Sequence, residues 1–190
     1  MVSIDGIVLA AGLSSRVGRY KLTLDMQGKT VVERCIESMY DICSNVIVVG
    51  GYNYNLLQDI LKPYSKVKMI LNENYLEGMF SSVKKGLYQV KGDKFFLTPA
   101  DYPLIKKDTY IKMLSTNSDI VIPTYKNIKG HPVLIKRRII NNILSEEYVS
   151  LREFINKHGF STLCIEDQGV LLDIDTDEDY IDILNRAKFY

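Results

Sequence analysis

The stretch "IDGIVLAAGLSSRVGRYK", residues 4–21, decides how the rest of the chain is interpreted. Residues 4–10 are mostly apolar, and a short apolar run bounded by turn residues predicts a buried β-strand. Residues 11–21 are rich in glycine and serine and contain Arg16, Arg19 and Lys21 but no carboxylate. We therefore expect a buried strand that ends in a small, flexible, cationic loop.

The same alternation of short apolar strand and helical segment continues along the chain. Residues 30–43 place Val32, Cys35 and Met39 on one helical face, behind a Thr30–Glu33 capping box. Such alternation predicts an α/β fold, a single-domain three-layer α/β/α arrangement around a Rossmann-like, doubly wound and mainly parallel sheet. The expected strands are 4–10, 45–50, 67–71, 94–98, 119–123, 131–135, 162–166 and 170–174, and the expected helices are 30–43, 55–62, 79–90, 107–114, 136–144, 150–158 and 176–187.

Composition excludes several classes of protein. The chain has 190 residues, 46% of them hydrophobic, which is enough for one domain with a real core. With 24 basic and 23 acidic residues it lacks the charge of a broad nucleic-acid surface. We expect no signal peptide and no membrane span. Cys35, Cys43 and Cys164 lack CxxC spacing, which argues against disulfides and zinc and fits a cytoplasmic protein.

The cationic loop has the chemistry of a polyphosphate site. Gly12 and Gly18 allow backbone N–H groups to approach an anion closely, and Arg16 and Lys21 add full charges. A dinucleotide fingerprint is absent, and "QGKT" (27–30) is no P-loop because Thr23 stands where its first glycine belongs. The alternative is an ordinary strand-to-helix connection with solvated basic side chains.

Carboxylates follow two of the later predicted strands, where ligands of doubly wound sheets are held. Asp101 lies in a loop after strand 94–98 and could bind a cation, although Asp near proline also serves in Asx turns. Asp173 and Asp175 lie at the end of predicted strand 170–174 and would point to one face. Either could complete a Mg²⁺ site with Asp101; we expect Asp173 rather than Asp175, which could instead be a turn residue.

The spacing L-A-A-G-x-S-x-R-x-G-x-x-K at 9–21 resembles the nucleotide-binding signature of the MobA-like nucleotidyltransferases. Further segments resemble the family in the same order over nearly the whole chain: "EGMFSSVKKGL" (77–87), "LTPADYPLI" (97–105), "KGHPVLI" (129–135) and "LDIDTDEDY" (172–180). Val17 departs from the methionine common in the family, and Asp177 replaces a proline. The resemblance implies a nucleotide-diphospho-sugar transferase-like fold.

The resemblance also implies roles for individual residues. An acceptor phosphate attacks the α-phosphorus of a nucleoside triphosphate, Mg²⁺ offsets the repulsion between the anions, and pyrophosphate leaves. No general base is needed when the attacking group is already a phosphate dianion. The implied catalytic residues are Lys21, Arg16 and Asp101; the metal ligands are Asp101 with Asp173 or Asp175; the acceptor-binding residues are Gly130 and His131; and the nucleotide-binding residues are Leu9, Ala10, Ala11, Gly12, Ser14, Arg16, Gly18, Lys21, Gly78 and Ser82.

Within the family, "LAAG" is typical of cytidylyltransferases and "LAGG" of guanylyltransferases, so Ala10-Ala11-Gly12 favours CTP. The acceptor implied by this branch is molybdopterin phosphate, and the product, molybdopterin cytosine dinucleotide, would pass to a molybdenum hydroxylase. Neither nucleic acid nor membrane is an expected partner. His131 could donate to an anionic acceptor, or it could be a turn residue before Pro132.

Two other functions remain open at this point. The chemistry could be kept with another acceptor, such as a sugar, polyol or choline phosphate; Ser14, where related isoprenoid enzymes often have glycine, argues mildly against that branch. The chain could instead be a non-catalytic chaperone that binds a nucleotide or cofactor. The presence of both Lys21 and Asp101 favours an enzyme.

Overall fold

Parallel strands form the centre of the sheet in the computed structural model, which describes residues 2–12, 20–145 and 148–189. The parallel neighbours occur in the order β3-β2-β1-β4. An antiparallel strand, β7, separates β4 from β5, and β5 also pairs with β6 and β8. The strands are β1 (Ile4–Ala10), β2 (Asn45–Gly50), β3 (Val67–Leu71), β4 (Lys94–Pro99), β5 (Ile120–Tyr125), β6 (Ile128–Lys129), β7 (Val133–Lys136) and β8 (Ser161–Cys164).

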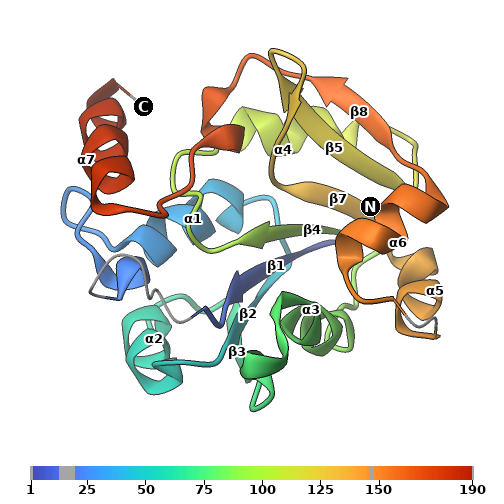
Figure 1. Ribbon diagram of the computed structural model, residues 1–190, viewed down its shortest axis with the longest axis horizontal. Coiled ribbons are helices and arrows are strands. Elements are labelled where there is room, and N and C mark those ends of the chain that lie inside the picture. Colours follow the sequence, from blue (N-terminus) through green and yellow to red (C-terminus); the bar gives the residue numbers. More distant parts are fainter. Residues whose placement is uncertain (1, 13–19, 146–147, 190) are drawn as a thin grey trace.

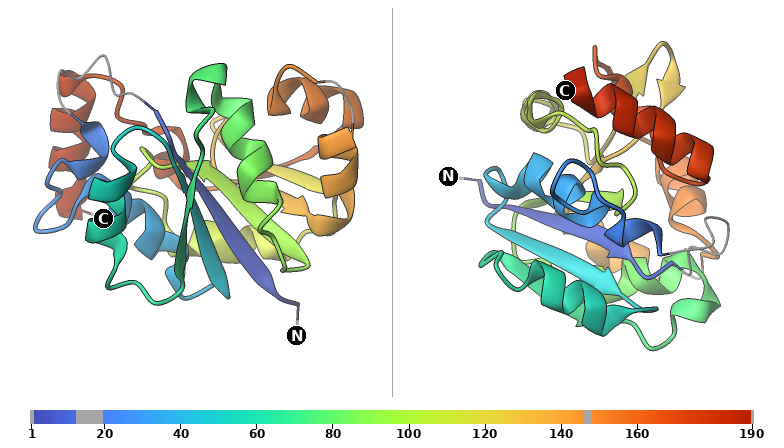
Figure 2. Two further views of the ribbon diagram at one scale, coloured as in Figure 1. Left: turned by 90° about the horizontal axis from the view of Figure 1, so that it is seen from below. Right: turned by 90° about the vertical axis from the view of Figure 1, so that its left-hand side faces the viewer.

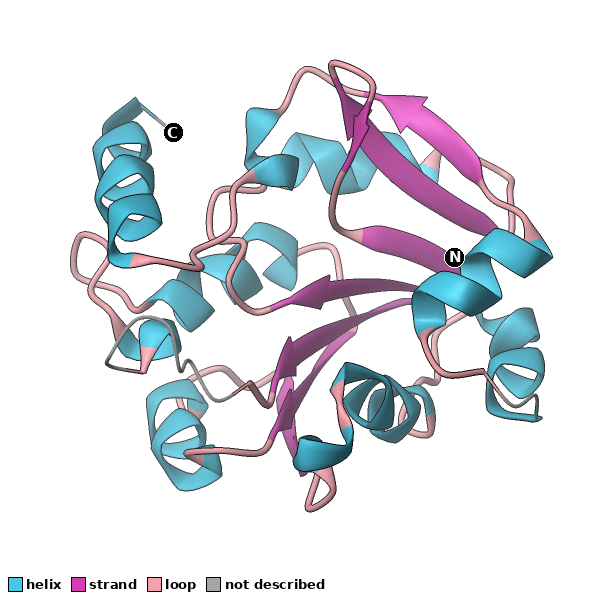
Figure 3. Ribbon diagram, viewed as in Figure 1, coloured by secondary structure: helices cyan, strands magenta, loops and turns pink. Residues whose placement is uncertain are grey.

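Helices cover both faces of this sheet (Figures 1 and 3). Side chains of β1 alternate between the two cores, because Val8 and Ala10 face one side while Ile7 and Leu9 face the other. The first core takes side chains from α1 (Val31–Tyr40), α2 (Tyr54–Leu61), α4 (Lys107–Leu114) and α7 (Asp177–Arg186), and the second from α3 (Met79–Leu87), α5 (Ile140–Ser145) and α6 (Leu151–His158). The predicted three-layer α/β/α fold with a mainly parallel sheet is therefore confirmed.

Helix starts follow the predicted capping chemistry. The Thr30 side chain accepts from the Glu33 N–H while the Glu33 carboxylate accepts from the Thr30 N–H, which completes the capping box of α1. Thr176 and Asp179 form the same arrangement at the start of α7. Among the described helices, none is long and apolar enough to cross a membrane.

The parallel strands end at one edge of the sheet, and this edge gathers the loops of interest. The left view of Figure 2 shows the N-terminus at one edge, and the first turn of α3 together with α6 at the opposite edge, where β1 ends. The loop after β4, which contains Asp101, lies beside the end of β1, because the Ala100 N–H donates to the Leu9 carbonyl. Segments distant in sequence therefore meet at the carboxyl edge.

One predicted strand, 170–174, is wrong. Residues Gln168–Leu171 form a 3₁₀ helix, η4, and residues 172–175 are irregular. The reason lies in the hydrogen bonds: the Val170 carbonyl accepts from the His131 N–H, and the Ile174 N–H donates to the Asp101 carbonyl. These backbone groups join separate loops rather than a strand ladder, and a short apolar run cannot reveal that difference in sequence.

Candidate active site

A cavity of about 380 Å³ opens at the ends of β1 and β4. Eight residues predicted for the site line it: Leu9, Ala10, Ala11, Gly12, Lys21, Ser82, Asp101 and Asp175. Leu22, Tyr75, Met79, Pro99 and Ala100 complete the lining. Ser14, Arg16 and Gly18 lie outside the described residues, so their predicted roles stay predictions.

Lys21 and Asp101 meet in the wall of this cavity. Lys21 Nζ lies 2.6 Å from Asp101 Oδ2, and the same nitrogen donates to the Ile174 carbonyl at 2.8 Å and to Asp175 Oδ1 at 3.2 Å. The side chains of Lys21 and Asp101 are each only 15% exposed. Burial opposes the lysine charge, but Asp101 and Asp175 outweigh it and raise the pKa of Lys21. The ammonium therefore stays charged and bridges three chain segments.

The second oxygen of Asp101, Oδ1, is buried and has no hydrogen-bond partner among the described residues. A buried carboxylate oxygen is costly without a cation or a donor beside it. No cluster of three or more His, Cys, Asp or Glu in the described part of the chain is arranged to hold a metal by itself. The residues therefore fit a cation that brings most of its ligands with it, as Mg²⁺ does when phosphates and water surround it.

The two later carboxylates occupy different positions. Asp175 lines the first cavity and contacts Lys21. Asp173 is half-buried, and burial, reinforced by the nearby Asp101 charge, raises the pKa of its carboxyl group. Of the two, only Asp175 lines the first cavity, whereas Asp173 lies close enough to Asp101 for the two charges to interact. The expected preference for Asp173 as the metal partner of Asp101 stays a prediction.

The end of β1 is held by a residue that sequence analysis missed. The Tyr20 hydroxyl donates to the Ala10 carbonyl at 3.3 Å and to the Tyr52 carbonyl at 3.2 Å, and its ring packs edge-on against that of Tyr52. The far end of the loop is thereby fastened to its beginning. At Gly12 an added Cβ would meet no atom of the described residues within 4 Å.

The first turn of α3 forms the opposite wall. Asn72 is fully buried, and its Nδ2 donates to Ser81 Oγ at 2.8 Å and to Ser82 Oγ at 2.9 Å. Gly78 precedes the helix with a φ of 105°, which favours glycine. Ser82 lines the first cavity, as predicted for a nucleotide contact, whereas Gly78 lines a neighbouring cavity.

This second cavity measures about 580 Å³ and shares Leu9, Met79 and Pro99 with the first. Both residues predicted to bind the acceptor, Gly130 and His131, line it. Its walls are largely apolar, and its polar members include Glu77, Tyr102, Lys129 and Arg152. Two adjoining cavities can hold two ligands side by side.

A break in the strand opposite β5 places His131 in this cavity. In the antiparallel partner of β5, Lys129 pairs with Thr124 and Leu134 pairs with Val121. Between these two pairs β5 has two residues, 122–123, whereas the partner segment has four, 130–133, so the extra residues bulge out. The His131–Pro132 peptide bond in this excursion is cis. A Cβ on Gly130 would lie 2.2 Å from the Val170 carbonyl oxygen, which explains the glycine.

The His131 ring packs edge-on against Tyr102, with centroids 4.9 Å apart. Its Nδ1 is buried without a hydrogen-bond partner among the described residues. Burial lowers the pKa of His131 to about 4, so the ring is neutral at pH 7. Sequence left open whether His131 donates to an anionic acceptor or is a turn residue before Pro132. A neutral ring can still offer one donor and one acceptor nitrogen, so its predicted contact with the acceptor stays a prediction.

Other residues of the two cavities escaped sequence analysis for identifiable reasons. Tyr102 lies in the 99–106 loop, where its position beside Asp101 was a usable signal. Tyr75 lines the first cavity, and the buried Asn72 lies behind the lining, where it donates to Ser82. Both lie in the loop after β3, which the fold class already indicates as a ligand-facing loop. Arg152 lies inside a helix and gave no local signal.

Comparisons with known proteins find relatives that match nearly the whole chain. The chain is 32% identical over 188 residues to the molybdenum cofactor cytidylyltransferase of Escherichia coli (strain K12), with 98% of each chain covered. It is 24% identical to a probable molybdenum cofactor guanylyltransferase of Bacillus cytotoxicus, over 99% of this chain and 100% of that one. A nucleotidyl transferase structure from Methanothermobacter thermautotroptrophicus has the same fold, with a TM-score of 0.86, 18% identity and 98% of each chain covered.

The family model of the MobA-like NTP transferase domain matches residues 6–162, a range that contains β1, the Asp101 loop and the Gly130–His131 excursion. Together with the full-length similarity to two nucleotidyltransferases, this match shows that the chain belongs to the MobA-like NTP transferase family.

Proposed function

We propose that this nucleotidyltransferase moves CMP from CTP to the phosphate of molybdopterin, giving molybdopterin cytosine dinucleotide and pyrophosphate. The observation that carries the proposal is the pair of adjoining cavities, with the Lys21–Asp101 pair in the wall of the first. The nucleotide would occupy the first cavity and the acceptor the second. The 32% identity to a protein named molybdenum cofactor cytidylyltransferase supports the choice of both substrates.

CTP would meet the end of β1 with its base and the loop cations with its phosphates. Ala10 and Ala11 are buried, and Gly12 lines the first cavity without a described atom within 4 Å of where a Cβ would be, so a base could approach the backbone at this turn. Lys21, with Arg16 from the loop, would contact the phosphates; Ser14 and Gly18 are further proposed contacts. The methyl group of Ala11, where the guanylyl branch has glycine, favours the smaller pyrimidine base.

Asp101 together with Asp175 or Asp173 would hold Mg²⁺, and the unpartnered Oδ1 of Asp101 is the ligand atom that we assign to it. Mg²⁺ at this position would offset the repulsion between the acceptor phosphate and the α-phosphate. Lys21 contacts the same carboxylate, and its charge would stabilise the charge that accumulates on the departing pyrophosphate. No side chain needs to remove a proton, since the acceptor phosphate is already ionised.

The second cavity suits a flat, partly polar acceptor. Phe80, Leu97 and Ile122 offer apolar contact, and the neutral His131 offers a hydrogen bond to a heterocycle. The phosphate of such an acceptor would point toward the shared residues Leu9, Met79 and Pro99 and thus toward the nucleotide. The product would be delivered to a molybdenum hydroxylase in the cytoplasm.

Pyrophosphate release tests the proposal directly. The purified protein is incubated with CTP and Mg²⁺ alone, with molybdopterin, and with ribitol phosphate, glycerol phosphate or phosphocholine. We expect release with molybdopterin only, weaker release when GTP replaces CTP, and none after EDTA. Turnover of another phosphate in place of molybdopterin would contradict the acceptor. Binding of CTP without any turnover would favour a non-catalytic binding protein.

A further inference from the structure

The first turn of α6 forms one wall of the second cavity. Ser150, Leu151 and Arg152 line the cavity, followed one turn later by Ile155 and Asn156. Ser150 caps the helix by accepting from the Glu153 N–H. The positive end of the helix dipole therefore faces the cavity, beside the guanidinium group of Arg152.

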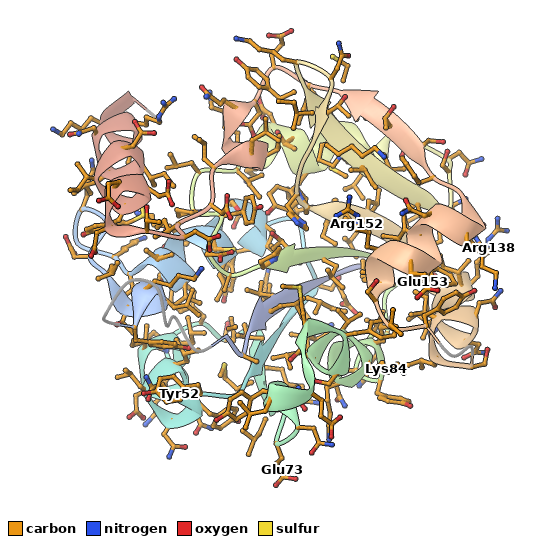
Figure 4. All side chains as sticks on the ribbon, in the orientation of Figure 1. Tyr52, Glu73, Lys84, Arg138, Arg152 and Glu153 are labelled. Carbon is orange, nitrogen blue, oxygen red and sulfur yellow. The ribbon has the colours of Figure 1, made fainter. Side chains whose placement is uncertain are left out.

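Arg152 differs from arginines that serve the fold. Arg138 lies 2.6 Å from Asp119, and Arg186 lies 2.7 Å from Asp182. Arg152 is exposed, and within the described part of the chain it makes no hydrogen bond or ion pair. Figure 4 shows its side chain extending from α6 toward the middle of the carboxyl edge, whereas Arg138 points outward at the periphery. An uncommitted guanidinium that points across a cavity is suited to an anion.

Two further observations indicate a polar, anionic ligand here. Lys129 also lines the cavity, and the only carboxylate among the described lining residues is that of Glu77, so the lining is net positive. His131 lines the same cavity with its buried Nδ1 unpartnered among the described residues. A neutral imidazole nitrogen of this kind can accept a hydrogen bond from a ring N–H. Arg152 and His131 would therefore recognise different parts of one ligand.

We propose that Arg152 is an acceptor-specificity residue: it binds the anionic group of the acceptor, with support from Lys129 and the start of α6. This inference rests on the proposed function, which supplies an acceptor in the second cavity. The ligand class is a phosphate monoester attached to a flat heterocycle. The heterocycle lies between apolar walls, and its phosphate is held by Arg152 at a site distinct from the phosphates of CTP. Holding the two anions from separate cations brings them together despite their repulsion.

Kinetics of Arg152→Gln and Arg152→Lys test this role. We expect Arg152→Gln to raise the KM for the acceptor at least tenfold while kcat and the KM for CTP stay within twofold. Arg152→Lys keeps the charge but loses the bidentate guanidinium group. Its KM for the acceptor should therefore lie between those of wild type and Arg152→Gln. Lys157→Gln removes a cation from the same helix outside the cavity lining and is the matched control; it should leave the KM for the acceptor unchanged.

A binding measurement without CTP or metal separates recognition from turnover. A fluorescent pterin carrying a phosphate and the same pterin without it are titrated into wild type and Arg152→Gln. Wild type should prefer the phosphorylated probe about tenfold, and the variant should bind both equally. An unchanged acceptor KM and an unchanged preference in Arg152→Gln would overturn the inference.

Failure of the proposed function would look different. If wild type used ribitol phosphate or phosphocholine instead of molybdopterin, the proposed acceptor would be wrong, and the effect of Arg152→Gln on the KM for that acceptor would decide the role of Arg152. If no acceptor were turned over, the titration with the two pterins would decide it.

Discussion

Lys21 Nζ lies 2.6 Å from Asp101 Oδ2, although 80 residues separate the two in sequence. The three donors of the ammonium are matched by three acceptors, since Ile174 and Asp175 supply the other two. Before any ligand binds, a protein cation thus balances carboxylates that would otherwise repel one another. In the proposed reaction, nucleotide binding exchanges part of this pairing for contacts with phosphate and Mg²⁺.

Asp101→Asn should abolish most catalysis and spare much of the nucleotide binding. The amide keeps the shape of the side chain but loses the charge that we assign to Mg²⁺. We expect pyrophosphate release to fall by at least about 100-fold, the range for losing one group that stabilises transition-state charge. Calorimetry should show only a modest loss of CTP affinity. A variant with the wild-type rate would remove Asp101 from the mechanism.

Lys21→Met should destabilise the fold because it leaves the Asp101 carboxylate without its paired ammonium group. Asp101 would become a largely buried carboxylate without its cation, at a cost of about 3 kcal/mol in the free energy of unfolding. Adding Asp101→Asn removes that carboxylate, so the double variant should be less destabilised than the two single losses predict, by about 1 kcal/mol or more. Urea unfolding of all four proteins at pH 7 measures this coupling.

The control for this cycle is Lys29→Met. Lys29 pairs with Glu37, but its side chain is 42% exposed, so its loss should cost less than about 1 kcal/mol. If Lys21→Met cost no more than Lys29→Met, the Lys21–Asp101 pair would contribute nothing to the resting structure.

Ala11→Gly should weaken the preference for CTP over GTP. Ala11 lies in the turn after β1, is only 8% exposed and lines the first cavity. Removing its methyl group enlarges the space beside the base, and we expect the ratio of the two affinities to fall on the order of tenfold. Competition binding with both nucleotides measures this ratio. Equal discrimination before and after the change would show that the turn does not read the base.

Sequence patterns predicted most of the elements and placed both Lys21 and Asp101 in the candidate site, each for a physical reason. Apolar runs and capping boxes reported local structure, and parallel strands bring their following loops to one edge. Helical spacing does not tell whether the end of a helix is buried, because that depends on the segments around it. Met79 has the spacing of a core residue, yet it is 66% exposed because the first turn of α3 faces the cavities.

The site was predictable only where a residue type itself carries the chemistry. Glycines and cations in one loop, and Asp101 beside prolines, have a composition that can be recognised. Arg152 and Asn72 are defined by position instead, since Arg152 lines a cavity from α6 and Asn72 donates to Ser82 from within the fold. The choice between Asp173 and Asp175 depended on irregular backbone, for which alternation gives no rule.

Wild type should lose stability in weak acid because of His131, and His131→Gln should not show this loss. The pKa of His131 is lowered to about 4 in the folded protein, whereas an unfolded histidine titrates near 6.5. Below pH 6.5 the His131 ring binds a proton in the unfolded chain but not in the folded protein. The free energy of unfolding therefore falls as the pH drops toward 4. We expect this group alone to cost about 2 kcal/mol between pH 6.5 and 5.0.

Urea unfolding of wild type and His131→Gln at pH 7.0, 6.0 and 5.0 tests this prediction. The variant should be less stable than wild type at pH 7.0, and the difference should shrink as the pH falls. A constant difference at all three values would mean that His131 titrates normally in the folded protein.

Asp167 connects the Asp101 loop to the segment that contains Asp173 and Asp175. Its loss should loosen both segments. The side chain is only 4% exposed. Oδ2 accepts from the Lys106 N–H at 2.8 Å and from Thr109 Oγ1 at 2.6 Å, while Oδ1 accepts from the Gly169 N–H at 3.0 Å. These bonds tie the end of the Asp101 loop to η4, which leads into the segment containing Asp173 and Asp175.

Asp167→Ala should therefore lower the free energy of unfolding by about 3 kcal/mol, since three donors lose their acceptor and two of these hydrogen bonds are buried. It should also lower kcat more than CTP affinity, because the carboxylates lose their fixed spacing. Asp108→Asn removes an exposed carboxylate at the start of α4 and is the control, with an expected change below about 0.5 kcal/mol. Equal unfolding midpoints for the two variants would mean that Asp167 does not hold these segments together.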